Sequence, residues 1–133
     1  MPQKFKGRRL CRYCNQKCKW VASIYCSNRC QFEQQYKIFI EKWKSGLITD
    51  DSNYIRRYIF EKYDGKCSSC GWKELNLYTG KKPLEVHHKD GDFRNNIENN
   101  LDLLCPNCHS LTSNYGSRNQ GYGRRKFLAA KLK

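Results

Sequence analysis

The chain has 133 residues, of which 38% are hydrophobic, and it carries nine cysteines and a formal net charge of +14. This length allows one ordinary domain or two very small ones. The low apolar content predicts a small core that needs additional stabilisation by disulfides or metal sites. No run approaches transmembrane length, and the N-terminal MPQKFKGRRL has no following apolar segment of a signal peptide. We therefore expect an intracellular protein with no membrane partner.

The positive charge comes from 26 Lys and Arg against 12 Asp and Glu. These basic residues are scattered among Tyr, Asn and Gly along the whole chain, whereas a membrane-surface protein usually carries a basic amphipathic helix. The distribution favours DNA or RNA as a partner. A basic protein that is merely soluble is the alternative. An odd number of cysteines, several in CxxC pairs, favours zinc over disulfides in an intracellular chain.

Residues 1–31 form a first segment with two cysteine pairs, Cys11-x2-Cys14 and Cys26-x3-Cys30. Four thiolates complete a tetrahedron around zinc and leave no open position, so this knuckle is predicted to be structural. Cys18 lies between the pairs as a competing thiolate. Ser27 is placed to cap a following helix, which favours the four named cysteines and leaves Cys18 as the spare.

Residues 32–64 are predicted to contain two helices that connect the cysteine-rich parts. The first carries an apolar stripe at helical spacing and is expected to end at Gly46. A second helix is expected over 54–63, closed by Asp64 and Gly65. The stripe comprises Phe32, Tyr36, Phe39, Ile40 and Trp43, and its last three members either enter the core or pair two chains.

Residues 65–115 hold a second set of paired cysteines around two apolar runs. A short alternating strand is expected over 84–87, a tight turn over 89–92, and a second strand at Leu101, Leu103 and Leu104. The residues after His109 are predicted to begin a helix. The basic tail, 116–133, is expected to become ordered on a partner. A structural zinc site is predicted at Cys67, Cys70, Cys105 and Cys108.

The chain reads LEVHHKDGDFRNNIENNLDLLCPNCH over 84–109. A paired histidine, an Asn-rich turn, Asn-Leu before a second strand and a terminal Cys-His make this stretch resemble the HNH endonucleases of phages and mobile elements. The resemblance covers about 66–115, under half of the chain. It implies an α+β fold: a small zinc-stapled ββα-metal nuclease domain, treble-clef-like, preceded by the N-terminal zinc knuckle and two helices.

The resemblance also implies roles for four residues. His87 and His109 would ligate a divalent ion, His88 would be the general base, and Asn100 would brace the loop. Phosphodiester hydrolysis needs a base that is neutral near pH 7 and a cation near the leaving oxygen, which imidazoles provide. Because neighbouring strand residues point to opposite sides, such a base and ligand must sit at a strand end or a bent loop.

The sequence departs from the family in ways that affect the catalytic metal. Many relatives have Asp where His87 stands, and imidazole favours Mn²⁺, Ni²⁺ or Zn²⁺ more than Mg²⁺. A further family variant has another histidine where this chain has Ser113, which leaves Asn114 as a weak candidate ligand. The DGD sequence at 90–92 is more typical of a turn than of a metal site. We place Asn95, Asn96 and Asn99 among loop residues, with Asn95 able to brace the turn.

Double-stranded DNA is the expected partner, and no small-molecule substrate is expected. One motif cuts one strand, so a double-strand break needs a dimer or two successive events. The sequence does not separate a homing, packaging or defence role, and a phage-encoded protein would act in the host cytoplasm. A non-catalytic zinc protein that binds DNA or RNA is the alternative function. The expected phosphate contacts are Arg8, Arg9, Arg12, Arg56, Arg57, Arg118, Arg124, Arg125 and Lys126.

Overall fold

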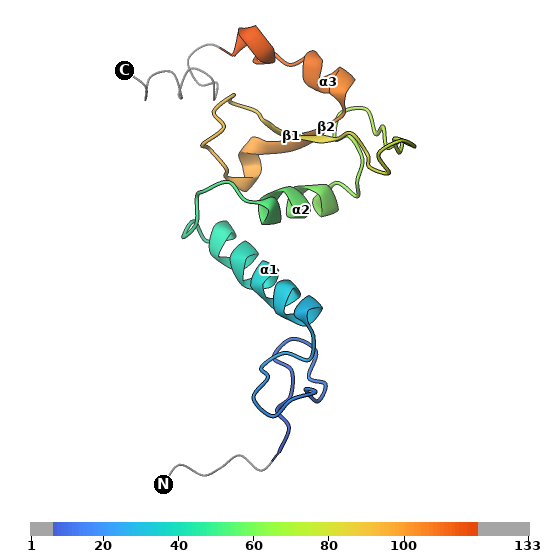
Figure 1. Cartoon of the computed structure of the whole chain (residues 1–133). Helices are drawn as coiled ribbons and strands as arrows, with labels where there is room; N and C mark the ends of the chain where they lie inside the picture. Colours follow the sequence, from blue (N-terminus) through green and yellow to red (C-terminus); the bar gives the residue numbers. More distant parts are fainter. Residues whose placement is uncertain (1–6, 120–133) are drawn as a thin grey trace, which may run out of the picture. The chain divides into compact units, whose positions relative to one another are not determined.

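The computed structural model describes residues 7–119 and divides the chain into two compact units, Met1–Lys42 and Trp43–Lys133. The described part has no helix long and apolar enough to cross a membrane. Its elements, shown in Figure 1, are α1 (Asn28–Lys44), α2 (Asn53–Lys62), β1 (Glu85–His88), a 3-10 turn η1 (Glu98–Asn100), β2 (Leu101–Leu104), α3 (Pro106–Ser110) and a 3-10 turn η2 (Gly116–Arg118). The expected small α+β fold is confirmed.

The first unit begins with a knuckle built around cysteine sulfur. Its two arms meet at an antiparallel bridge between Leu10 and Lys17, and the Cys18 amide donates to the Arg9 carbonyl at 2.9 Å. Cys11, Cys18 and Cys30 are the buried residues of this unit's core cluster, with Tyr25 packed against them. The knuckle therefore depends on its cysteines in place of an aliphatic core.

Helix α1 begins at Asn28, four residues before the start of the expected apolar stripe. Ser27 caps it as predicted, because its hydroxyl accepts from the Cys30 amide at 3.2 Å. The helix ends at Lys44, followed by Gly46 with φ +81°. Phe32, the first member of the expected stripe, lies in α1 and is exposed, whereas Ile40 and Trp43 near the end of the helix are buried.

Helix α2 in the second unit follows the prediction closely. Ser52 is its N-cap and accepts from the Tyr54 amide at 3.2 Å. Asp64 and Gly65 follow its end with φ values of +53° and +59°. A Cβ on Gly65 would lie 2.9 Å from the Phe60 ring, so both the backbone conformation and the lack of space require glycine there.

Strands β1 and β2 form an antiparallel hairpin in which His87 pairs with Asp102 and His88 with Leu101. Side chains alternate across its two faces. Helix α2, in which Ile55 and Ile59 are buried, contacts β2. Helix α3 contacts both strands, and Figure 1 shows α2 and α3 on opposite sides of the hairpin. The two adjacent histidines are thus separated by the sheet itself.

Helix α3 corrects the prediction of a helix after His109. It begins at Pro106, with Cys105 as its N-cap, and His109 lies near its end. The Cys105 sulfur accepts from the Cys108 amide at 3.4 Å, and proline suits the first helical position because it needs no donor there. The CxxC pair therefore starts the helix, which places His109 one turn from the strand end.

Candidate metal centres and active site

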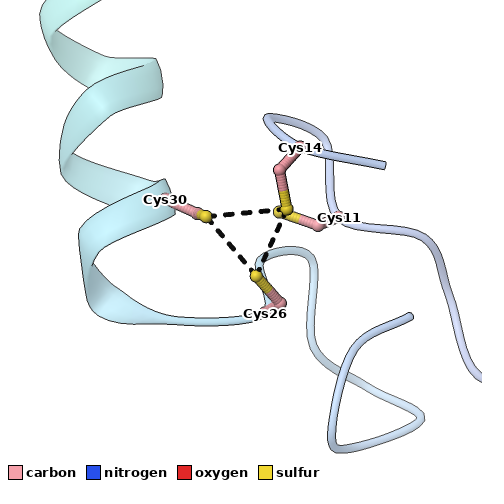
Figure 2. Close-up of side chains that lie close together, drawn as sticks. All are labelled: Cys11, Cys14, Cys26 and Cys30. Atoms are coloured by element: carbon pink, nitrogen blue, oxygen red, sulfur yellow. Dashed lines mark hydrogen bonds between the residues drawn. The ribbon is translucent and has the colours of Figure 1, made fainter. Parts of the chain in front are cut away.

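The N-terminal knuckle brings Cys11, Cys14, Cys26 and Cys30 together, and Figure 2 shows their sulfur atoms converging. The sulfur of Cys26 lies 3.5 Å from that of Cys14 and 3.4 Å from that of Cys30. Cys30 and Cys14 are 3.8 Å apart. Four sulfurs held tetrahedrally at the usual Zn–S length of about 2.3 Å would be separated by about 3.8 Å. The cluster has the size and donor set of a zinc site.

The second cluster consists of Cys67, Cys70, Cys105 and Cys108. The sulfurs of Cys70 and Cys105 are 3.7 Å apart, close to the same tetrahedral spacing. Trp72 and Leu84 pack against the buried cysteines. The Ser68 amide donates to the Leu103 carbonyl at 2.8 Å, which joins this knuckle directly to β2. A metal ion here would fix the base of the hairpin.

In each cluster one thiol has a lowered pKa and another has a raised pKa. Although burial opposes its ionisation, amides of Cys14 and Cys26 lower the pKa of Cys11 to about 6. The pKa of Cys67 is lowered in the same way to about 6 by amides of Cys70 and Cys105. Hydrogen bonds to neighbouring thiols raise the pKa of Cys26 and of Cys108 to about 12. A cation among the sulfurs would favour the ionised form of all four thiols.

The histidines predicted as catalytic-metal ligands, His87 and His109, lie together. Their ring centroids are 5.2 Å apart at an angle of 64°, although they come from β1 and α3. His87 is only 8% exposed, and burial, followed by the nearby His109, lowers its pKa. A neutral imidazole is the form that binds metal. Within residues 7–119 no third His, Cys, Asp or Glu completes a cluster of ligand atoms with this pair.

Glu85, which was not predicted from the sequence, contacts the candidate metal ligand His109. Its carboxylate lies 2.6 Å from Nδ1 of His109. A proton held at Nδ1 leaves the lone pair of Nε2 free, and a carboxylate partner of this kind orients a metal-binding histidine. Glu85 precedes His87 by two positions, so both occupy the same face of β1. This two-residue spacing in a predicted strand could have placed Glu85 beside His87 from the sequence alone.

An open cleft of about 700 Å³ lies beside His87. The Lys89 ammonium and the Asp102 carboxylate lie 3.4 Å apart, and the Tyr63 hydroxyl donates to Asp102 at 2.9 Å. Burial and this hydrogen bond raise the pKa of Tyr63 to about 12, so it remains a donor at neutral pH. The lining residues are Tyr63, Ser68, Ser69, His87, Lys89, Asp102, Leu104, Cys108, Leu111, Thr112 and Ser113. Hydroxyls and a lysine suit a phosphate-bearing ligand.

The structure does not bring His88 together with His87 and His109. As the last residue of β1, His88 lies on the other face of the hairpin and lines a separate pocket of about 150 Å³ with Ile55 and Leu101. Its Nε2 is 2.8 Å from Oδ1 of Asn96. Asn96 lies in the loop, as expected, but it is only 5% exposed, because tertiary contacts that the sequence does not show bury it.

Asn100 sits at the centre of the loop between the strands. Its side chain accepts from the Asp90 amide at 3.1 Å and donates to the Asp90 carboxylate and the Asn95 carbonyl, at 2.9 and 2.8 Å. Asn95 donates to Asp90 at 2.6 Å. The amide of Asn114 donates to the carbonyls of His88 and Lys89, so it secures the turn. These contacts hold the chain immediately after the two histidines.

The basic residues predicted to contact phosphate are distributed over both units. Arg8, Arg9 and Arg12 are exposed on the knuckle. On α2 the Arg56 guanidinium lies 3.6 Å from Asp51, and Arg57 lies 2.8 Å from Glu61. Exposed Arg118 donates to the Ser110 carbonyl. The remaining three, Arg124, Arg125 and Lys126, lie outside the described residues.

Two curated proteins resemble the chain in sequence. H-N-H endonuclease F-TflIV of Escherichia phage T5 is 51% identical over 93 residues, which cover 68% of this chain and 40% of that protein. Zorya protein ZorE of Escherichia coli is 37% identical over 78 residues, or 59% of this chain and 20% of that protein. The chain thus spans well under half the length of both relatives. No protein-family model and no solved structure matches it.

The similarity to the phage protein agrees with the motif and with the architecture. At 51% identity over 68% of the chain, the matched part shares its origin with that protein. The short hairpin, the helix that follows it and the two cysteine clusters are the features that the motif predicts. The chain is therefore a homologue of an HNH endonuclease, and the resemblance to that family read from the sequence is confirmed.

Proposed function

We propose that this protein is a metal-dependent HNH endonuclease that hydrolyses phosphodiester bonds of double-stranded DNA. The observation that carries the proposal is the convergence of the His87 and His109 rings, 5.2 Å apart, beside a cleft lined with hydroxyls and Lys89. The net charge of +14 favours a polyanionic substrate. The homologous phage protein is named an H-N-H endonuclease.

The two cysteine clusters are proposed to hold structural zinc, and His87 and His109 a divalent ion. The two histidines fit an ion whose remaining positions belong to water and substrate. Such an ion supplies Lewis acidity toward a phosphate oxygen and the leaving 3′ oxygen. Imidazole ligands favour Mn²⁺, Ni²⁺ or Zn²⁺ over Mg²⁺, and we expect activity with Mn²⁺ or Ni²⁺. Glu85 orients His109, and burial keeps His87 uncharged.

His88 is proposed to remove the proton from the attacking water. A neutral imidazole is suited to this step at neutral pH. Because His88 faces away from His87, this role requires the attacking water and the phosphate to reach His88 beyond the end of β1. Asn100 and Asn114 hold the backbone of that strand end through Asp90 and through the carbonyls of His88 and Lys89.

The cleft and the exposed arginines are proposed to hold the DNA backbone. Lys89, Ser68 and Thr112 line the cleft next to His87 and are suited to phosphate oxygens. Affinity should fall steeply with salt if about six to ten phosphates are neutralised. A monomer with one such site nicks one strand, and a double-strand break requires a second site or a second event.

Replacement of His88 tests the proposal. His88→Ala should reduce plasmid cleavage by roughly 10²–10⁴-fold, the usual contribution of a general base. Zinc content and DNA affinity should stay close to those of the wild type, since His88 belongs to neither cysteine cluster. Undiminished cleavage by the variant would show that His88 is not the base.

The position of His88 favours a second candidate function, that of a zinc-dependent protein that binds DNA or RNA without cutting it. Such a protein needs the two cysteine clusters and the basic surface but no base beside a metal ligand. It would bind plasmid DNA with a strong salt dependence. Wild-type protein that binds in this way, and leaves the plasmid intact with every divalent ion, would support this second function.

A further inference from the structure

The pocket around His88 contains a residue to which the proposed function gives no role. Asn96 is held from three sides. Its backbone carbonyl accepts from the Trp43 indole at 2.6 Å, and its amide nitrogen donates to the carbonyls of Thr49 and Arg94 at 3.2 and 3.3 Å. Because the nitrogen faces two acceptors, the side-chain oxygen has to face the other way, toward His88.

The orientation of this amide fixes the tautomer of His88. The Asn96 Oδ1 atom is only an acceptor, so the His88 Nε2 at 2.8 Å has to carry the proton. In a neutral imidazole the lone pair then lies on Nδ1. That bond is the ring's sole hydrogen bond within residues 7–119, and no buried side-chain nitrogen or oxygen described there lacks a partner. Nδ1 is therefore not fully buried, and its lone pair makes no hydrogen bond to the described residues.

We infer that Asn96 is a positioning residue that holds His88 as the Nε2–H tautomer, so that Nδ1 is the atom that takes the proton from water. This inference rests on the proposed role of His88 as the base. Asn96 touches neither the substrate nor the metal ligands in this scheme, and it acts only through the imidazole. A misplaced tautomer is costly, since fixing the tautomer of a catalytic histidine can be worth several orders of magnitude in rate.

The tautomer can be read directly by ¹⁵N NMR of the histidine rings. The chain has three histidines, so the spectrum is simple, and a His88→Gln sample assigns the resonances of His88. The full-length zinc-loaded protein is used at a pH where imidazole is neutral, without DNA. The wild type should show a protonated Nε2 and an unprotonated Nδ1 at His88. Asn96→Ala should give a mixture of both tautomers.

Two control variants separate positioning from stability. Trp43→Phe removes the hydrogen bond to the Asn96 carbonyl but leaves the Asn96 amide in place, so it should lower stability and leave the tautomer unchanged. Asn99→Ala removes an exposed side chain of the same loop and keeps the carbonyl that Lys89 contacts. It should change neither the tautomer nor the cleavage rate.

Single-turnover cleavage completes the test. Asn96→Ala should cut DNA at least ~10-fold more slowly than Trp43→Phe of comparable stability. A wild-type spectrum with the proton on Nδ1, or an Asn96→Ala protein with unchanged tautomer, would overturn the inference whether or not DNA is cut. An Asn96→Ala protein that is no slower than Trp43→Phe would overturn it as well. A wild type with the expected tautomer that cuts no DNA would overturn the proposed function and, with it, the role of Nδ1.

Discussion

Glu85, His87 and Asp102 share one face of the hairpin, and Val86 and His88 share the other. This alternation follows from the strand geometry alone, and it separates two histidines that are adjacent in sequence. The sequence motif identified His87 and His109 as partners, and the structure places them together. It did not include Glu85 or Asn96, because their hydrogen bonds to the histidines depend on strand register and loop packing. The sequence showed only that Glu85 shares a strand face with His87.

Removal of the Glu85 carboxylate should weaken the catalytic metal site. In Glu85→Ala the His109 ring loses the partner at its Nδ1, so both ring orientation and ligand basicity suffer. Affinity for Mn²⁺ should fall by roughly 10–100-fold. Titration of zinc-loaded protein with Mn²⁺, followed by electron paramagnetic resonance of the free ion, measures this change. Glu74→Ala removes an equal charge from an exposed position and should leave the affinity unaltered.

A side chain at Gly91 would displace the side chains of Asn119 and Asn114 in the turn after His88. The φ of Gly91 is +77°, and a Cβ there would lie 2.7 Å from the Asn119 side chain and 3.0 Å from that of Asn114. Gly91→Ala should therefore cost more than about 1 kcal/mol in unfolding free energy, through backbone strain and loss of the Asn114 contacts. Urea unfolding measures the difference. Gly80→Ala has a similar positive φ but open space, so it should be the milder change.

At the level of helices and strands, local signals in the sequence predicted most boundaries. Ser27 capped α1, and Asp64 with Gly65 closed α2, because capping and left-handed conformations depend on residues next to the boundary. Helix α3 was placed too late. Its five residues, Pro106–Ser110, are too few to show periodicity, and the helix starts from the cysteine pair itself. Where tertiary packing determines the end of a helix or strand, the neighbouring residues did not predict that end.

Glu98 joins α1 and α2 to the loop before β2, and it should make stability depend on pH. Its carboxylate accepts from the Tyr58 hydroxyl at 2.9 Å and from Lys62 at 3.0 Å, with Lys44 at 4.0 Å. Burial opposes ionisation, but these partners lower the pKa of Glu98 below its usual 4.5. The stabilisation is therefore present above about pH 4.5 and is lost as the pH falls through the lowered pKa.

Glu98→Gln tests this sign. The variant should lose about 1 kcal/mol of unfolding free energy at pH 7, because the acceptor of both hydrogen bonds loses its negative charge. The difference from the wild type should shrink as the pH is lowered well below 4.5, where both side chains are uncharged. Urea unfolding of the two zinc-loaded proteins at each pH gives this difference. A gap that widens toward acid pH would contradict the assignment.

On the scale of the whole molecule, two sulfur clusters compensate for a small apolar core. Sequence spacing predicted both sets of four cysteines, since each CxxC turn places two thiolates on one side of a short loop. Cys18 was predicted as the spare, and it lies in the core of the knuckle outside the four-sulfur cluster.

Zinc content should therefore be close to two ions per chain, one per cluster. Cys14→Ser should lower the content to about one, and Cys18→Ser should preserve both ions. Elemental analysis of gel-filtered protein measures the ratio. Prolonged chelation should unfold both units, because a structural zinc contributes on the order of 10–16 kcal/mol. A content near one in the wild type would remove the N-terminal site.

The central claim is that a divalent ion between His87 and His109 supports hydrolysis of DNA. Incubation of purified zinc-loaded protein with supercoiled plasmid, in the presence of Mg²⁺, Mn²⁺, Ni²⁺ or EDTA, tests it most directly. Nicked plasmid should accumulate with Mn²⁺ or Ni²⁺ and should be absent with EDTA. Plasmid that stays supercoiled with every ion, while the protein retains its zinc and binds the DNA, would contradict the account.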